Sequence, residues 1–282
     1  MRIENVRMIA LDIDGTLMDS RKRFPEINCR ALQACERRGV RVALVSGRSF
    51  ELMRRFAREM GVNAMMAACN GARIEAGPNG PTLWEGHFAR ADALRVLHVL
   101  EESGMYFNAY RRGKCYMGNP EVRERLGERY AHHVPGVEGD ADYPYETVCD
   151  RARLHGEGMD GAYKFVVMGA PYDPGFARIR EALSDMELSV SSASRRNVEF
   201  MPTGVDKGSA LKKLCEAAGI APESVMAFGD QTNDLPMLRA AGFPVAMENG
   251  EEAVRRAAKF IAPHHDLGGV GLFLEEHLLK EG

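Results

Sequence analysis

The chain has 282 residues, of which 45% are hydrophobic and 27% are charged, a composition typical of globular proteins. Its 37 Lys and Arg residues are matched by 40 Asp and Glu residues, so it lacks the excess basic charge that would hold nucleic acid or an anionic membrane. Because it shows neither a signal-peptide pattern nor an apolar run as long as a membrane span, we expect a cytoplasmic protein.

A chain of this length favours a core domain with an inserted second domain over one undivided domain. Its six Cys residues include no Cys-x-x-Cys pair and stand mostly among apolar neighbours, so we expect reduced side chains packed in the interior. They are Cys29, Cys35, Cys69, Cys115, Cys149 and Cys215. The adjacent pairs His132-His133 and His264-His265 cannot share one helix face, and we assign no metal to them. The oligomeric state is left open.

The first part of the chain alternates predicted strands and helices. Strands are expected over residues 8–11, 40–45 and 64–68, and helices over residues 25–38 and 49–60. The stretch 73–88 is interrupted by a Gly- and Pro-rich turn and is typical of a hairpin. Polar residues follow each of the three strands, which is the pattern of a doubly wound parallel sheet.

Between residues 89 and 192 the pattern changes to mixed polar and aromatic strands with several helices, including a charged helix near residues 120–132. The core pattern then returns with an apolar strand over residues 198–201. The predicted fold is therefore α/β, with a doubly wound, Rossmann-like parallel sheet core built from residues 1–88 and 193–282. Residues 89–192 are expected to form an inserted α/β cap domain.

Two carboxylates, Asp12 and Asp14, directly follow the first predicted strand. Alternation along a strand points both side chains the same way, and Gly15 allows a sharp turn after them. Two carboxylates held this close repel each other unless a cation lies between them, and Mg²⁺ is the natural choice for oxygen ligands. An Asp-x-Asp pair also opens an EF-hand loop, but the required Gly and Glu positions are occupied here by Leu17 and Arg23. The EF-hand is therefore excluded.

Further polar residues follow other predicted strands, and parallel strands bring their carboxyl ends to one edge. A helix start adds one Lys residue to this set. The added residues are Ser46, Gly47, Lys207, Asp230, Asn233 and Asp234. Together with Asp12 and Asp14 they provide a nucleophile, a metal site and phosphate-holding groups, which are the requirements of phosphoryl transfer.

Each carboxylate receives an expected role. Asp12 is the expected nucleophile, and Asp14 the general acid and base. Asp12, Asp230 and the backbone carbonyl of Asp14 are expected to bind Mg²⁺, with Asp234 orienting the site from a second shell.

The phosphate is expected to contact four other residues. Ser46 and the Gly47 amide can donate hydrogen bonds to its oxygens, and Lys207 adds a charge at a helix N-terminus. Asn233 is expected at the rim of the same site. Asn70 either bends the chain or lies beside the substrate, and the sequence does not separate these two readings.

Four motifs resemble those of the haloacid dehalogenase superfamily. They are Asp-Ile-Asp-Gly-Thr at 12–16, Ser-Gly-Arg at 46–48, Gly-Val-Asp-Lys-Gly around Lys207, and Gly-Asp-Gln-Thr-Asn-Asp at 229–234. The Asn70-Gly71-Ala72 segment, the late Lys motif and the mid-chain insert resemble the Cof-type branch, which carries an α/β cap. This resemblance implies a magnesium-dependent phosphatase that acts through an aspartyl-phosphate, on sugar phosphates or other small phosphorylated metabolites.

Two other functions remain open at this point. A phosphomutase would use the same Asp pair but return the phosphoryl group to its substrate, and a sugar-phosphate-binding protein would use the fold without catalysis. The sequence also departs from the family pattern in two places. Gln231 stands where Gly or Ser is common, and the segment around Asp266 lacks the acidic residue often found before Gly-Val. The roles of Gln231 and Asp266 are not assigned.

Overall fold

The computed structural model describes residues 3–121, 146–170, 172–192 and 196–280. These residues divide into two units. The first unit contains the described residues up to Arg48, Met53–Glu85, and the described residues from Asp206 onward. The second contains Ser49–Leu52 and the described residues of Gly86–Val205.

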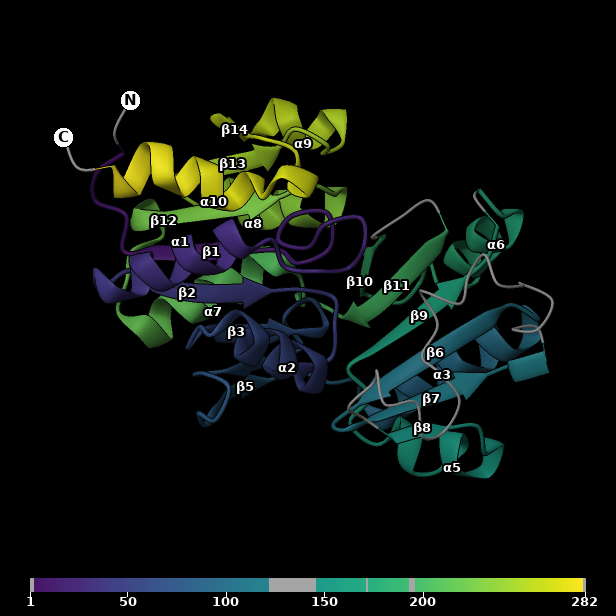
Figure 1. Cartoon of the computed structure of the whole chain (residues 1–282). Helices are drawn as coiled ribbons and strands as arrows, with labels where there is room; N and C mark the ends of the chain where they lie inside the picture. The colour runs from purple at the N-terminus through teal and green to yellow at the C-terminus, as the bar shows by residue number, and fades with distance from the viewer. Residues whose placement is uncertain (1–2, 122–145, 171, 193–195, 281–282) are drawn as a thin grey trace. The chain divides into compact units, whose positions relative to one another are not determined.

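The first unit is built on an eight-stranded sheet in the order β14-β13-β12-β1-β2-β3-β4-β5 (Figure 1). The strands from β14 to β3 are parallel to their neighbours, whereas β4 and β5 pair antiparallel. Their bounds are β1 (Met8–Leu11), β2 (Arg41–Val45), β3 (Met65–Ala68), β4 (Arg73–Glu75), β5 (Thr82–Glu85), β12 (Val225–Gly229), β13 (Phe243–Met247) and β14 (Phe260–Ala262). The central strands are fully buried, as expected for a parallel sheet covered on both faces.

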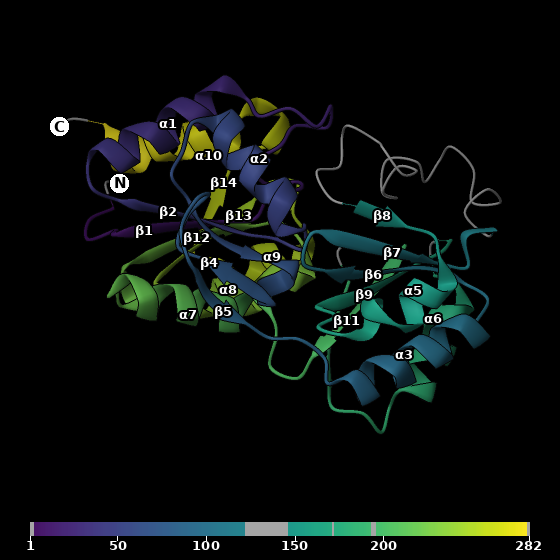
Figure 2. The same ribbon diagram turned by 90° about the horizontal axis from the view of Figure 1, so that it is seen from below.

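Helices cover both faces of this sheet, with α1 and α10 on one side and α7 and α8 on the other (Figure 2). On the first side, Phe273 of α10 packs edge to face against Phe228 of β12. On the second, Leu211 and Leu214 of α7 share a buried cluster with Met8 of β1. The bounds are α1 (Glu26–Arg37), α2 (Phe50–Met60), α7 (Lys207–Ala218), α8 (Leu235–Ala240), α9 (Glu252–Ala257) and α10 (Gly269–Leu274), with 3₁₀ turns η1 (Cys69–Gly71), η4 (Pro222–Ser224), η5 (Thr232–Asp234) and η6 (His265–Leu267) and a π-turn η7 (Glu275–Leu279).

The second unit has its own six-stranded sheet in the order β10-β11-β9-β6-β7-β8. All described pairs are antiparallel except β7 with β8. The strands are β6 (Tyr106–Arg111), β7 (Lys114–Gly118), β8 (Glu146–Val148), β9 (Lys164–Met168), β10 (Leu188–Ser191) and β11 (Asn197–Pro202), and the helical elements are α3 (Arg90–Glu102), α5 (Arg151–His155), η3 (Glu157–Met159) and α6 (Pro174–Ala182).

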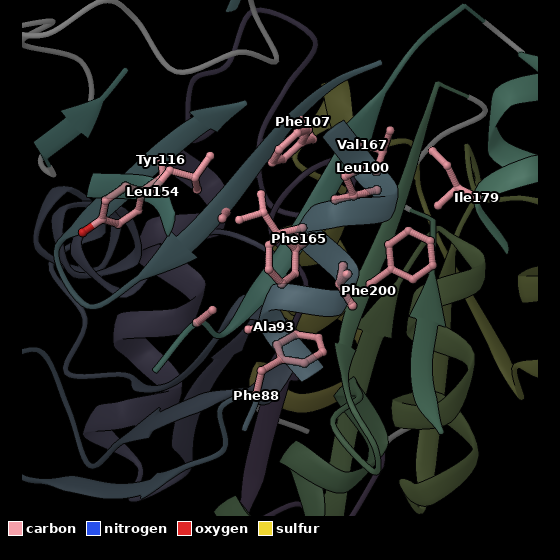
Figure 3. Close-up of a cluster of buried hydrophobic side chains, with 14 of the residues drawn as sticks. Phe88, Ala93, Leu100, Phe107, Tyr116, Leu154, Phe165, Val167, Ile179 and Phe200 are labelled. Carbon is pink, nitrogen blue, oxygen red and sulfur yellow. The ribbon is translucent and has the colours of Figure 1, made fainter. Parts of the chain in front are cut away.

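One face of this second sheet carries a separate hydrophobic core (Figure 3). Phe165 of β9 and Phe200 of β11 meet Leu100 of α3 and Ile179 of α6 in this core. Phe88 packs edge to face on Phe165, with 5.3 Å between ring centroids. Each unit therefore buries its own apolar side chains.

The α/β architecture with a parallel core sheet is confirmed, but the strand β11 is not where the sequence placed it. It was expected in the core, after residue 193, and instead pairs with β9 and β10 in the second sheet. The alternation explains this placement, because Val198 and Phe200 enter the hydrophobic core while Glu199 between them pairs with Lys164. Strict alternation is typical of antiparallel strands, whereas strands of a parallel core are apolar throughout.

Other differences are local. The sequence between residue 132 and Gly161 is typical of a loop-rich stretch, and the structure adds β8 and the short helix α5 there. The charged helix expected near residues 120–132, and the pair His132-His133, lie almost wholly outside the described residues. No disulfide joins the six Cys residues, all of which lie in the described part of the chain, and Cys35, Cys69, Cys115 and Cys215 are buried. No helix in the described part of the chain combines the length and apolar character that crossing a membrane would need.

The close packing of α10 on α1 depends on Gly271. A Cβ atom at this position would lie 2.6 Å from the backbone carbon and oxygen of Ile27. We expect Gly271→Ala to lower the free energy of unfolding by about 1–3 kcal/mol, because backbone cannot yield as a flexible side chain does. The better helix propensity of Ala offsets only part of this loss. Thermal unfolding should show a lower Tm for Gly271→Ala than for the exposed neighbour variant Leu272→Ala, and an equal or higher Tm would contradict the packing argument.

Candidate active site

The carboxyl ends of three adjacent strands, β12, β1 and β2, lie at one edge of the first sheet. Leu11 pairs with Phe228 on one side and with Leu44 on the other. The residues after these strand ends include Asp12, Ser46 and Asp230, and all three are buried. The Asp12 amide donates to the carbonyl of Phe228 at 3.1 Å, which continues the strand pairing into the site. The sheet therefore brings these three side chains to one edge.

Lys207 lies between two buried carboxylates of this site, and its Nζ is 2.6 Å from Asp12 Oδ1 and 2.5 Å from Asp234 Oδ1. It is 1% exposed, at the first position of α7. Asp206 caps this helix by accepting from the Ser209 amide at 2.7 Å. Burial opposes the charge of Lys207, but its two carboxylate partners overcome this and hold its pKa above the usual value.

Asp12, Asp230 and Asp234 form a buried acidic cluster whose carboxylate oxygens lie within 4.8 Å of one another. Thr16 donates to Asp230 Oδ1 at 3.1 Å, and Gln231 Nε2 donates to Asp230 Oδ2 at 3.3 Å. Asp234 Oδ2 accepts from the amides of Asp230 and Gln231 at 2.9 and 3.0 Å. Asp234 thus holds together the loop that carries Asp230.

The electrostatics of this acidic cluster favour an additional cation. Burial raises the pKa of Asp12 to about 7, against the opposing effect of Lys207. Burial and the nearby charge of Asp12 raise the pKa of Asp230 to about 8. Three buried carboxylates face one ammonium group, so their full ionisation leaves uncompensated negative charge. An all-oxygen donor set of this kind fits Mg²⁺.

The carboxylate of Asp14 lies outside the acidic cluster. It accepts from Arg48 Nε at 2.8 Å and Arg48 Nη2 at 2.7 Å, and from Lys22 Nζ at 2.9 Å. Its side chain is 34% exposed. Burial would raise the pKa of Asp14, but Arg48 and then Lys22 hold it well below its usual range. Only the backbone carbonyl of Asp14 was expected to meet the metal, and that expectation stays a prediction.

The remaining predicted residues lie around the same edge. The Oγ atom of Ser46 accepts from the Arg48 amide at 3.3 Å, and the Ser46 carbonyl accepts from the Asn70 amide at 2.9 Å. Gly47 joins Ser46 to Arg48 in the same turn. Among the described residues, the buried Oδ1 atom of Asn233 meets no hydrogen-bond partner. A buried acceptor without a partner is unusual and is consistent with a position beside a ligand.

Sequence reasoning gave no role to Arg48 or Lys22, which hold Asp14. Arg48 had a visible signal, because it follows Ser46 and Gly47 at a strand end. Lys22 had none, since its contact depends on how the loop after β1 folds back. Gly15, in that loop, has a φ of +79°, and a Cβ there would lie 2.2 Å from Asp230 Oδ2. Glycine is therefore needed both for the turn and for space.

Comparison with known proteins agrees with this site. The family model described as haloacid dehalogenase-like hydrolase matches residues 9–274. The chain is 24% identical to the 5-amino-6-(5-phospho-D-ribitylamino)uracil phosphatase of Bacillus subtilis, over 98% of this chain and 97% of that protein. It is 30% identical to the phosphoglycolate phosphatase of Methanopyrus kandleri, over 97% of each chain.

A solved structure shows the same fold. It is a haloacid dehalogenase-like hydrolase from Bacillus subtilis, which is 24% identical and superposes with a TM-score of 0.83 over 97% of this chain and 100% of that chain. The match of the family model covers nearly the whole sequence, and the curated relatives above are phosphatases. The chain therefore belongs to the haloacid dehalogenase-like hydrolases and is a phosphatase of that family.

Proposed function

We propose that this protein hydrolyses small phosphate monoesters in a magnesium-dependent reaction that passes through a phosphorylated Asp12. The observation that carries this proposal is the buried acidic cluster at the end of β1, in which Asp12, Asp230 and Asp234 face the single ammonium group of Lys207. The balanced charge of the chain supports a small-molecule substrate over nucleic acid, and we expect a cytoplasmic enzyme.

Asp12 is the proposed nucleophile. Lys207 binds its Oδ1 atom at 2.6 Å, which fixes the carboxylate and supports its ionised form. A carboxylate oxygen of Asp12 attacks phosphorus, an Asp–phosphate bond forms, and the bond from phosphorus to the ester oxygen breaks. Water then attacks the same phosphorus, which releases inorganic phosphate and restores the Asp12 carboxylate. The overall reaction consumes one water molecule and needs no other reactant.

Asp14 is the proposed proton donor and acceptor. It gives a proton to the leaving ester oxygen in the first half and takes one from water in the second. In the structure Asp14 is bound by Arg48 and Lys22, which hold it as a carboxylate. The first half therefore requires that Asp14 leave these partners, take up a proton from solvent and then meet the leaving oxygen.

The acidic residues also form the proposed metal site. Asp12, Asp230 and the backbone carbonyl of Asp14 would hold Mg²⁺, and when bound the cation neutralises the charge of the phosphate and the carboxylates. Asp234 would orient the metal ligands without binding the metal itself, because its Oδ1 already binds Lys207 and its Oδ2 accepts from two backbone amides.

The phosphate oxygens are proposed to meet Ser46, the Gly47 amide, Lys207 and Asn233. The Ser46 hydroxyl and the Gly47 amide follow β2 at the edge where Asp12 lies. Asn233 would donate to the phosphate through its Nδ2 atom, since its Oδ1 atom can only accept. These donors would hold the phosphoryl group in line with Asp12.

We further propose that residues 89–192, extended to include β11, act as the substrate-selecting cap, with the remainder as catalytic core. The named relatives act on phosphorylated small molecules, one with a ribityl chain and one a glycolate. Sugar phosphates and related alkyl phosphates are therefore the first substrates to test. The panel is glucose 6-phosphate, phosphoglycolate, 5-amino-6-(5-phospho-D-ribitylamino)uracil and p-nitrophenyl phosphate.

Replacement of the nucleophile gives the first prediction here. Asp12→Asn should lower kcat by about 10⁴-fold or more on every active ester, because an amide oxygen cannot form a stable bond to phosphorus. Phosphate release is measured beside thermal unfolding and circular dichroism, which should show a folded protein. Retained activity would remove Asp12 as nucleophile. A wild-type enzyme that moves phosphate within a substrate without releasing it would indicate a phosphomutase.

Magnesium should bind more tightly at higher pH. The raised pKa values of about 7 for Asp12 and about 8 for Asp230 mean that both carboxyls are largely protonated at pH 6 and more ionised at pH 8. Because Mg²⁺ must displace these protons, its affinity should rise at least about tenfold from pH 6 to pH 8. Calorimetric titration measures this, and chelation should abolish turnover until Mg²⁺ is restored. Equal affinity at the two pH values, or activity in a chelator, would contradict the metal assignment.

The rate lost on replacing Asp14 should increase with the basicity of the leaving group. Asp14→Ala should slow the alkyl esters of the panel by about 10²–10⁴-fold, because their alkoxide leaving groups need a proton. The loss with p-nitrophenyl phosphate should be much smaller, since p-nitrophenolate leaves without protonation. The two ratios of kcat/KM are compared in one preparation, because kcat/KM reports the first half of the reaction and excludes the hydrolysis step that both esters share. Equal losses on both kinds of ester would argue against general acid catalysis by Asp14.

A further inference from the structure

The loop between β1 and α1 carries Asp14 and Thr16, and its backbone is tied to residues from the C-terminal part of the chain. Asn249 Nδ2 donates to the carbonyl of Gly15 at 2.8 Å. His265 Nδ1 meets the carbonyl of Met18 at 2.6 Å. Because a carbonyl can only accept, His265 must carry its proton on Nδ1. Both bonds hold backbone of the loop.

Asp266 ties the same loop at a third point. Its Oδ1 accepts from the Ser20 amide at 2.6 Å, and its Oδ2 accepts from the Ser20 hydroxyl at 2.9 Å. Both carboxylate oxygens are thus used on one residue of the loop. A charged acceptor with two such bonds is stronger than a neutral one. This contact gives Asp266 a structural partner that its sequence context did not indicate.

The three tying residues also support one another. Asn249 follows β13, whereas His265 and Asp266 lie in the η6 turn after β14. The His265 amide donates to Asn249 Oδ1 at 3.0 Å, so Asn249 binds the loop with one end of its amide and the η6 turn with the other. The side chains form one connected support, reaching the loop at Gly15, Met18 and Ser20.

One of the supported positions is Gly15, whose backbone can deform more easily than that of other residues. Gly15 has a positive φ and no side chain to restrain its backbone. It directly follows Asp14, and its Cα approaches Asp230 so closely that a Cβ would lie 2.2 Å from Oδ2. A shift of the Gly15 carbonyl therefore moves Asp14 relative to the acidic cluster.

We propose that Asn249, His265 and Asp266 are positioning residues of the reaction, which fix the backbone of residues 15–20 and thereby place Asp14 for proton transfer to the leaving group. The proposal rests on the proposed phosphatase mechanism and on the role of Asp14 within it. None of the three is assigned a contact with substrate. Their effect on the reaction is carried by the loop backbone, so it must appear in the step that uses Asp14.

The side chain of His265 allows a matched pair of substitutions. In His265→Asn the amide nitrogen falls near the position of Nδ1, so it can still donate to Met18. In His265→Gln the amide nitrogen falls near Nε2 and cannot replace that bond without a shift. Both variants remove the ring and carry the same amide group, and they differ by one methylene, which sets the position of the donor. Asp266→Asn weakens the hydrogen bonds to Ser20, and Asn249→Ala removes the hydrogen bond to the carbonyl of Gly15, so each variant tests another contact of the loop.

The experiment compares kcat/KM for p-nitrophenyl phosphate with kcat/KM for the alkyl ester of the panel that the wild-type enzyme hydrolyses fastest, at saturating Mg²⁺, because kcat/KM reports the first half of the reaction and not the hydrolysis of phospho-Asp12 that both esters share. We expect His265→Gln and Asn249→Ala to lower the rate on the alkyl ester, the alkyl rate, about tenfold or more. This loss is a part of the 10²–10⁴-fold acceleration that a general acid supplies. The p-nitrophenyl rate should stay within about twofold of the wild type, and His265→Asn should restore the alkyl rate to within about threefold.

Thermal unfolding and a control variant separate positioning from a loss of stability. Leu214→Ala removes a buried side chain of α7, and we expect it to lower Tm without changing the ratio of the two rates. Equal losses on both esters in His265→Gln and Asn249→Ala would overturn the proposal, as would unchanged alkyl rates. A wild-type enzyme inactive on the whole panel would instead overturn the proposed function itself. A loss of the alkyl rate alone in Asp266→Asn would show that the contact with Ser20 also positions Asp14. An unchanged ratio of the two rates in this variant would remove Asp266 from the positioning residues.

Discussion

Three carboxylates buried around one ammonium group are the constraint on which the site depends. Lys207 binds Asp12 and Asp234 at 2.6 and 2.5 Å, while the carboxylate of Asp230 accepts hydrogen bonds from two neutral donors, Thr16 and Gln231. Burying three ionised carboxylates beside one ammonium group is unfavourable in free energy, and for this reason the pKa values of Asp12 and Asp230 are raised. The same imbalance makes the cluster suitable for a divalent cation. The arrangement is unfavourable as a packed interior and useful as a reaction centre.

The parallel sheet makes this crowding possible by fixing each carboxylate on rigid backbone. Asp12 and Asp230 follow adjacent strands, and the Lys207 and Asp12 that meet here are 195 positions apart in the chain. Asp234 connects the two parts, since it binds Lys207 with one oxygen and the Asp230 loop with the other. The C-terminal segment supports the site from outside through Asn249, His265 and Asp266. Positions far apart in sequence therefore contribute to one small volume.

Much of the core sheet and of the site could be predicted from the sequence, because apolar strands followed directly by carboxylates form a recognisable sequence pattern. The positions of Asp12, Asp230 and Lys207 follow from strand ends and a helix start. The partners of Asp14 could not be predicted, since Arg48 and Lys22 reach it only through loop conformations that no periodicity encodes. The strand β11 was assigned to the wrong sheet because a short apolar run was given more weight than the Glu199 in its middle. Side-chain ties to a loop carbonyl, such as that of His265, leave no pattern in sequence at all.

The pairing of β1 with β12 also has a consequence for how the chain folds. Met8 lies beside Val225, so the central strand of the first sheet gains one of its two neighbours only when the last third of the chain is present. Contacts of such long sequence separation form slowly. During synthesis one apolar edge of β1 therefore stays unpaired until β12 has been made. The strands of the second unit lie between β1 and β12 in the sequence, so this unit can already form its own core. The reaction centre is therefore completed only after β12 has been made, and a chain that stops before β12 contains Asp12 and Lys207 but neither Asp230 nor Asp234.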